Sequence, residues 1–101
     1  MRSIKIVTVC GSGTVGSAIL ATRLGELLKK YGYITEITGS SPDKIQEIDL
    51  EKYDLVVYIS PVDVETTVPM LNGTGFLLGI NSEEFMGKCL DIVGKLELYE
   101  D

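Results

Sequence analysis

The feature that most constrains the fold is a run of mostly β-branched residues, SIKIVTV (residues 3–9), that leads directly into three closely spaced glycines. Such a run predicts a central parallel strand buried on both faces of a sheet. Gly11, Gly13 and Gly16 spell G-x-G-x-x-G, the pattern of a tight strand-to-helix turn whose backbone approaches a phosphate group. The first segment of the chain therefore favours an α/β fold with an anion site after its first strand.

Strands and helices alternate along the rest of the chain. Apolar residues recur at helical spacing after the glycines, and Gly32 is expected to end this helix as a C-terminal cap. Further strands are expected at residues 33–38, 54–60 and 75–80. A short helix through Ile45 and Ile48 is expected to follow the turn after the second strand.

A final helix is expected after the fourth strand. Asn81, with Glu84 three residues later, resembles a capping pair at its start. Its apolar face is expected to bury Phe85, Met86, Cys89, Ile92, Val93 and Leu96.

The length of 101 residues suits one domain, residues 1–101. The alternation predicts an α/β fold, with a four-stranded parallel sheet of order 2-1-3-4. The sheet is doubly wound, with helices on both faces and right-handed crossovers, as a Rossmann-like three-layer sandwich. Ligands of such sheets bind outside the carboxyl ends of the strands, near the switch in strand order. This places the candidate site at residues 10–17, and the loop at residues 60–74 is expected to end at the same edge.

Composition excludes several classes of function. The chain has no histidine, which excludes Ser-His-Asp and Cys-His pairs and the usual histidine-containing metal sites, so neither metal nor cofactor is expected. A net charge of −6 argues against nucleic acid as a partner. The two cysteines make no disulfide framework. No apolar run approaches a membrane span and no signal peptide is visible, so a cytoplasmic protein is expected.

Charge is spread unevenly along the chain. Residues 1–32 carry a net charge of +4, and residues 33–101 carry a net charge of −10. The ordinary interpretation is a set of solvated helix faces. The alternative is a mildly positive field near the first loop, which suits a phosphoryl group.

The position of Cys10 distinguishes it from an ordinary buried cysteine. A structural role is the default for a free cysteine, and it fits Cys89 on the apolar face of the last helix. Cys10 instead ends a strand and faces a helix start, where unpaired N–H groups favour an anion and the reactive thiolate. We interpret Cys10 as a nucleophile. Its phosphate-binding residues, which supply backbone amides and hydroxyls, are Gly11, Ser12, Gly13, Thr14, Val15, Gly16 and Ser17.

Three other classes of protein that carry a ligand-binding loop after the first strand fit this sequence less well. A protein tyrosine phosphatase of the low-molecular-weight type needs an arginine six residues after the cysteine, where this chain has Gly16. A dinucleotide-binding domain expects an acidic residue at the end of the second strand, whereas Glu36 lies inside the expected strand. Flavodoxin is disfavoured because the chain is short for five strands and has no tryptophan.

The chain resembles the enzyme IIB component of a sugar phosphotransferase system, of the galactitol-like and related ascorbate-like kind. The resemblance covers almost the whole chain and rests on IVTVCGSGTVGSA (6–18) and VPMLNGTGFLLGI (68–80). It implies that Cys10 is the phosphorylated residue and that residues 11–17 are its phosphate loop. The commoner galactitol-type loop has small hydroxyl residues more often around Gly16 and Ser17, a departure that concerns the sugar more than the phosphocysteine.

The resemblance also implies a phosphotransferase mechanism. Cys10 accepts a phosphoryl group from phosphohistidine on a IIA subunit and passes it to a sugar or polyol, with a galactitol-like polyol favoured. The acceptor is bound by the membrane subunit IIC, which would hold this chain at the inner face of the membrane. A non-catalytic, anion-sensing regulatory module remains an alternative, as does a small dinucleotide-binding domain.

The loop after the third strand supplies a second set of candidate residues. Its polar side chains are expected to share the carboxyl edge with Cys10, either as a solvated loop or as partner contacts. These residues are Asp63, Glu65, Thr66 and Thr67.

Overall fold

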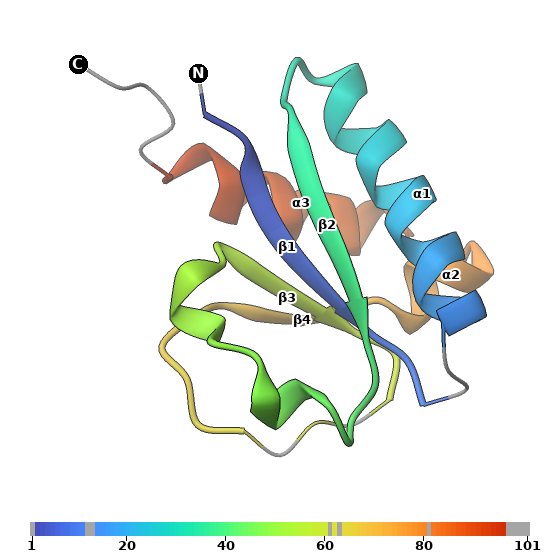
Figure 1. The fold of residues 1–101 in the computed structure, drawn as a ribbon. Helices are drawn as coiled ribbons and strands as arrows, with labels where there is room; N and C mark the ends of the chain where they lie inside the picture. Colours follow the sequence, from blue (N-terminus) through green and yellow to red (C-terminus); the bar gives the residue numbers. More distant parts are fainter. Residues whose placement is uncertain (1, 12–13, 61, 63, 81, 97–101) are drawn as a thin grey trace.

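The computed structural model describes residues 2–11, 14–60, 62, 64–80 and 82–96, with the side chains of residues 14–17 left out. Its strands are β1 (Ile4–Val9), β2 (Thr35–Ser40), β3 (Leu55–Tyr58) and β4 (Met70–Asn72). Its helices are α1 (Thr14–Lys30), α2 (Thr74–Leu78) and α3 (Ser82–Gly94), and the 3-10 turns η1 (Ile45–Glu47) and η2 (Leu50–Lys52) precede β3 (Figure 1).

The four strands form one parallel sheet in the order β2-β1-β3-β4, which confirms the predicted order. Val9 pairs with Ser40 on one side and with Tyr58 on the other, and Tyr58 pairs with Asn72. All four strands therefore end along one edge of the sheet. The strand order switches at β1, so the residue after Val9 lies between the ends of two neighbouring strands.

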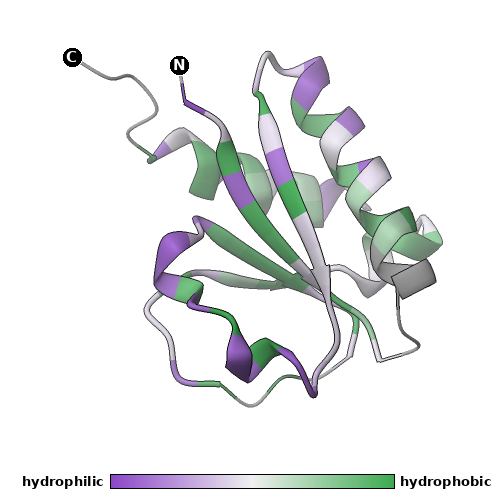
Figure 2. Ribbon diagram, in the orientation of Figure 1, coloured by the Kyte–Doolittle hydropathy of each residue, from purple (hydrophilic) through white to green (hydrophobic). Residues whose placement is uncertain are grey.

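Successive side chains of β1 and β3 point to opposite faces of the sheet and contribute to two apolar clusters, one on each face. One cluster packs β1 and β3 beneath α1 and α3, and its most buried members include Ile6, Leu24 and Val57. The other cluster lies on the opposite face, beneath η1 and η2. Figure 2 shows β1 and β3 as mainly hydrophobic, β2 as mainly polar, and the turns before β3 as partly hydrophilic. The prediction that helical segments cover both faces is confirmed, with α1 and α3 on one face and the short 3-10 turns η1 and η2 on the other.

The short helix expected through Ile45 and Ile48 is present as two 3-10 turns. Ile45 in η1 and Leu50 in η2 are buried against Val7 and Val56 of the sheet. Each turn is three residues long, because one buried side chain per turn anchors this segment instead of a continuous apolar stripe.

The end of α1 follows the prediction made for Gly32. Gly32 has a positive φ of 89°, and its N–H donates to the carbonyl of Lys29 at 3.0 Å. The N–H of Tyr33 donates to the carbonyl of Leu28 at 3.0 Å. This pair of bonds is the Schellman motif, and it delays the start of β2 to Thr35.

The predicted fourth strand is wrong. Residues 75–80 were expected to extend, but β4 is Met70–Asn72 and the following residues form α2. The side-chain Oδ1 of Asn72 accepts a hydrogen bond from the N–H of Thr74 at 2.9 Å, and this turn starts the helix. Periodicity cannot separate a short apolar run such as GFLLGI into helix or strand. The adjoining VPMLN segment supplies the pairing with β3 instead.

The last helix agrees with its predicted apolar face. Phe85, Cys89 and Val93 of α3 are buried, and Met86, Ile92 and Leu96 are half-buried. The expected capping residue Asn81 lies outside the described residues.

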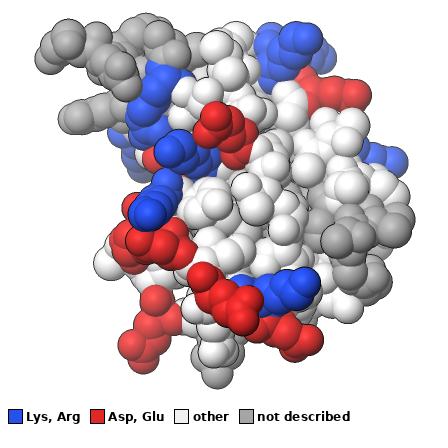
Figure 3. Space-filling view, viewed as in Figure 1, with Lys and Arg blue, Asp and Glu red and all other residues white. Residues whose placement is uncertain are grey.

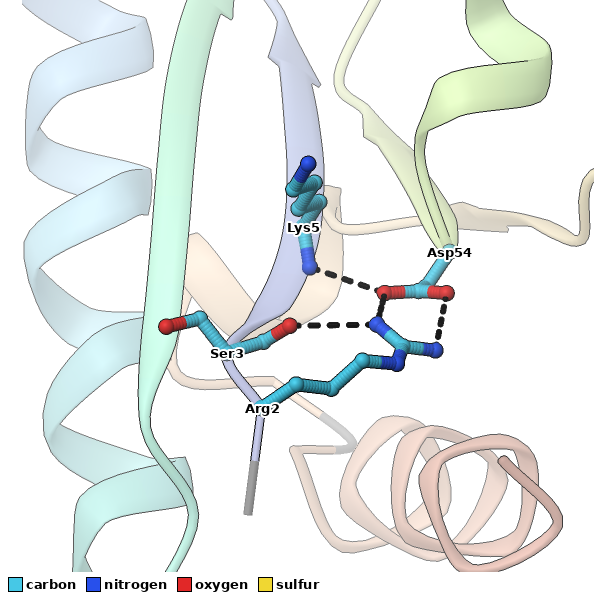
Figure 4. Close-up of polar contacts among 4 residues, drawn as sticks. All are labelled: Arg2, Ser3, Lys5 and Asp54. Atoms are coloured by element: carbon cyan, nitrogen blue, oxygen red, sulfur yellow. Dashed lines mark hydrogen bonds and ion pairs between the residues drawn. The ribbon is translucent and has the colours of Figure 1, made fainter. Parts of the chain in front are cut away.

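A charged network holds the start of β1 against the start of β3 (Figure 4). Both guanidinium nitrogens of Arg2 donate to the carboxylate of Asp54, at 2.8 and 2.9 Å, and the N–H of Lys5 donates to it at 2.9 Å. The Arg2 hydrogen bonds lower the pKa of Asp54, although partial burial opposes this effect. The network lies at the amino ends of these strands, at the opposite edge from Cys10.

We expect Asp54→Asn to lower the free energy of unfolding at pH 7 by about 1–2 kcal/mol, since three hydrogen bonds to a charged group lose strength. The folded pKa is below the unfolded value of about 3.9, so the stabilisation is present above that pH and is lost as the pH falls through the folded pKa. Urea titrations at pH 7 and at a series of lower pH values should show a difference that is full at pH 7 and shrinks as the pH falls below about 3.9. Glu84→Gln, which removes the exposed pair with Lys88, is the matched control and should change stability far less.

Candidate functional site

Cys10 lies at the carboxyl edge of the sheet, between the ends of β2 and β3. Its N–H donates to the carbonyl of Ser40 at 3.1 Å, which extends the β1–β2 ladder by one bond. On the other side, the N–H of Ile59 donates to the carbonyl of Val9 at 2.8 Å. The backbone on either side of the cysteine is thus fixed by both neighbouring strands. Cys10 itself is buried, with 5% of its surface exposed.

The first turn of α1 begins four residues after Cys10, at Thr14. The N–H groups of a first helical turn have no partner within the helix and favour an anion in front of them. The structure therefore places the backbone of Thr14, Val15, Gly16 and Ser17 in the first turn of α1. The predicted loop residues Ser12 and Gly13 lie outside the described residues.

Gly11 contacts a residue that the sequence did not identify as part of the site. Its N–H donates to the hydroxyl Oγ of Ser60 at 2.7 Å. A Cβ at Gly11 would lie only 2.6 Å from the same oxygen, so this approach requires glycine. The available signal was weak: Ser60 follows the third apolar run as Cys10 follows the first, and the parallel register brings the two strand ends together.

The start of α2 meets the same edge. The hydroxyl of Thr74 donates to the carbonyl of Ile59 at 3.3 Å, and the N–H of Gly73 donates to the carbonyl of Tyr58 at 2.8 Å. Two hydroxyl groups, those of Thr74 and Ser60, thus make hydrogen bonds just beyond β3. The edge around Cys10 is lined by small polar groups that suit a bound anion better than a large apolar ligand.

The basic residues of the first 32 positions do not gather at this edge. Arg2 pairs with Asp54 at the other edge, and Lys29 and Lys30 lie in the last turn of α1. Arg23 donates from Nη1 to the carbonyl of Leu77 at 2.7 Å, where it caps the end of α2. Solvated surface charge is therefore the better interpretation of the uneven charge. In the view of Figure 3, acidic side chains gather over the region where Figure 1 shows the turns η1 and η2.

The loop after β3 does not bring Thr66 and Thr67 to Cys10. The hydroxyls of both threonines donate to the carboxylate of Glu51 in η2, at 3.1 and 2.9 Å. These bonds lower the pKa of Glu51, that of Thr67 more than that of Thr66. The prediction that they share the carboxyl edge with Cys10 is wrong, because the loop must return to the amino end of the sheet before β4 begins. Asp63 lies outside the described residues.

Cys89 is a core residue. It is 0% exposed, in the cluster between α3 and the sheet, and burial raises the pKa of its thiol to about 11. Within the part of the chain that the structure describes, no group of three or more His, Cys, Asp or Glu side chains could hold a metal ion. Nor does any described helix have both the length and the apolar character needed to cross a membrane.

Comparison with known families identifies the family of this chain. Residues 5–88, which span β1 through most of α3, match the family described as PTS system, Lactose/Cellobiose specific IIB subunit. The chain belongs to this family. The chain is also similar to an Escherichia coli (strain K12) protein described as putative phosphotransferase enzyme IIB component SgcB. The two are 29% identical over 79 residues, which cover 78% of this chain and 85% of the relative.

Membership of the PTS IIB family supports a phosphocarrier role in a sugar phosphotransferase system. IIB components are phosphotransferases, and the family implies IIA and IIC partners in general. The galactitol-like subfamily is not confirmed, because the matching family is described by lactose and cellobiose.

Proposed function

We propose that Cys10 is the phosphocysteine of this IIB component and that residues 11–17 bind the transferred phosphoryl group. One observation supports this most strongly: Cys10 follows the central strand at the switch in strand order, and α1 begins four residues later. The second cysteine of the chain, Cys89, is enclosed in the core and has no such position.

The proposed reaction has two balanced steps. The Cys10 thiolate attacks the phosphorus of phosphohistidine on IIA, forming an S–P bond as the P–N bond breaks and its electron pair returns to the imidazole. A hydroxyl oxygen of the acceptor bound to IIC then attacks the same phosphorus. The S–P bond breaks, the thiolate is restored, and the hydroxyl proton passes to a base outside this chain, which has no histidine.

The loop contributes positioning and neutral hydrogen-bond donors. Phosphoryl transfer depends mainly on alignment and on stabilising charge on the equatorial oxygens. The backbone amides of Ser12, Gly13, Thr14, Val15, Gly16 and Ser17 would supply these donors, with hydroxyls from Ser12, Thr14 and Ser17. The N–H of Gly11 donates to Ser60 instead, so Gly11 contributes the start of the loop. None of these residues is an arginine. A loop without one suits a carrier, whose intermediate must be passed on without rapid hydrolysis.

The partners and the acceptor complete the proposal. We propose a chain with one IIB domain that receives phosphate from IIA and meets IIC at the cytoplasmic face of the membrane. A galactitol-like polyol is the acceptor proposed from the sequence, and a disaccharide of the lactose or cellobiose type is the competing acceptor because of the family match. The alternative of a non-catalytic, anion-sensing regulatory module predicts no onward transfer of phosphate to any acceptor.

Incubation with its cognate IIA subunit in the phosphohistidine form tests the proposal. We expect one phosphoryl group per chain, on the peptide that contains Cys10, as determined by mass spectrometry. Phosphate on another residue, or none on the folded protein, would contradict the assignment. Adding IIC with galactitol, lactose or cellobiose then identifies the acceptor by which phosphorylated product forms, and the absence of any product would favour the regulatory role.

A further inference from the structure

The hydrogen bond between Gly11 and Ser60 joins two residues that are 49 positions apart, immediately beyond the ends of β1 and β3. The strands pair through backbone groups as far as Val9 and Tyr58, and Ile59 adds one more backbone bond to β1. One residue further along, the acceptor is the Ser60 side chain. The first peptide of the candidate phosphate loop is therefore held by a hydroxyl group.

We propose that Ser60 is a positioning residue for phosphoryl transfer at Cys10. Its hydroxyl fixes the Gly11 peptide, and with it the direction in which the phosphate loop leaves the sheet. The inference rests on the proposed function of Cys10 and extends it to a residue outside the loop. Ser60 acts through Gly11 rather than on the phosphoryl group itself.

The residue before Ser60, Ile59, is fixed by hydrogen bonds on both sides of its backbone. The N–H of Ile59 donates to Val9, and the carbonyl of Ile59 accepts from the hydroxyl of Thr74. The backbone before Ser60 is thus attached to β1 and to the start of α2. A hydroxyl on a fixed backbone defines a position for its partner, whereas one on a mobile loop does not.

The short contact between Gly11 and Ser60 explains why residue 11 is a glycine when residue 60 carries a hydroxyl. The N–H of Gly11 is 2.7 Å from Oγ, and a side chain at residue 11 would meet that oxygen at 2.6 Å. Alanine at residue 60 removes the atom that accepts this hydrogen bond, so the Gly11 N–H would lose this partner. A misplacement of about 1 Å near reacting groups can cost up to about a hundredfold in rate.

Ser60→Ala is expected to lower kcat for transfer from phosphorylated IIA by about tenfold or more, with KM for IIA nearly unchanged. Ser60→Thr restores the hydroxyl at a half-buried position and should recover kcat to within about threefold. Thr66→Ala is the matched control, because it also removes a hydroxyl hydrogen bond but does so against Glu51, away from the site. Its kcat should equal that of the unchanged protein.

A double-mutant cycle separates this role from general destabilisation. Gly11→Ala is expected to push the Ser60 hydroxyl aside and break the same hydrogen bond. The losses from Gly11→Ala and Ser60→Ala should therefore not multiply, and the double variant should be no more than about twofold slower than the slower single variant. Thermal unfolding of each variant shows whether it is folded at the assay temperature.

The outcomes distinguish the inference from the proposed function. Unchanged kcat in folded Ser60→Ala, equal losses in Ser60→Ala and Ser60→Thr, or losses that multiply in the cycle would overturn the role of Ser60 alone. Failure of the unchanged protein to accept phosphate at Cys10 would overturn the proposed function and this inference with it. A slow Ser60→Ala, a restored Ser60→Thr and an unchanged Thr66→Ala would establish the positioning role.

Discussion

Replacement of Cys10 by serine is expected to reduce phosphoryl acceptance from IIA to background while leaving the fold intact. The change replaces a thiol that ionises with a hydroxyl that does not ionise in the physiological range, so no comparable nucleophile remains. Serine is close to cysteine in size, and the backbone bonds from Cys10 to Ser40 and from Ile59 to Val9 do not involve the side chain. Incorporation of labelled phosphate from IIA and circular dichroism of the same sample measure the two effects.

Cys89→Ser is the matched control for this experiment. It places a hydroxyl in the fully buried cluster beneath α3, which should lower the free energy of unfolding by about 1–3 kcal/mol. Phosphoryl transfer should be retained at temperatures where this variant is folded. If folded Cys10→Ser accepted phosphate at the original rate, another residue would be the carrier and the glycine loop would need a different explanation.

Much of the sheet could be predicted because its signals are local. The β-branched run at residues 3–9 and the DLVVYIS run at residues 54–60 correspond to β1 and β3, which are buried on both faces apart from Lys5 and are therefore mainly apolar. Gly32 was predictable as a helix end because the Schellman motif demands a residue that tolerates a positive φ. The strand order was predictable because 2-1-3-4 is a common order of doubly wound parallel sheets.

The region of β4 and α2 could not be predicted from local signals. The strand is three residues long, and what selects it is its pairing with β3. The helix that follows is five residues long, too short to show helical periodicity, and it begins at a turn made by the Asn72 side chain. The apolar runs alone therefore could not decide which of the two segments is the strand and which is the helix.

The candidate site, too, could be predicted only in part. Cys10 stood out because it is next to the glycines in the sequence and follows the strongest strand. The contribution of Ser60 depends on a register between β1 and β3 that a single sequence does not specify. The error over Thr66 and Thr67 has a related cause, since where that loop turns back depends on its bonds to Glu51. Cys10 could be predicted because its neighbours in the sequence mark it. Ser60 could not, because its role depends on residues that lie near it only in the folded chain.

Alkylation of the native protein by iodoacetamide at pH 7.5 is expected to modify Cys10 at least about a hundredfold faster than Cys89. Only the thiolate reacts, and a pKa of about 11 leaves roughly one Cys89 in three thousand ionised at this pH. Cys89 is also enclosed between α3 and the sheet, so the reagent reaches it only when the core opens. Cys10, at the sheet edge, requires no opening of either apolar cluster.

Peptide mapping after quenching at several times measures the two rates separately. Unfolding in urea is the control, because it removes the enclosure of Cys89 and should bring the two rates to within a few fold of each other. Raising the pH toward 11 in the folded state should accelerate Cys89 as its thiolate forms, as long as the protein stays folded. Equal rates in the native protein, or faster modification of Cys89, would remove the case for Cys10 as the more reactive thiol. In that event phosphoryl transfer through Cys10 would need an opening of the site that its partner must induce, because only 5% of the residue is exposed in the free chain.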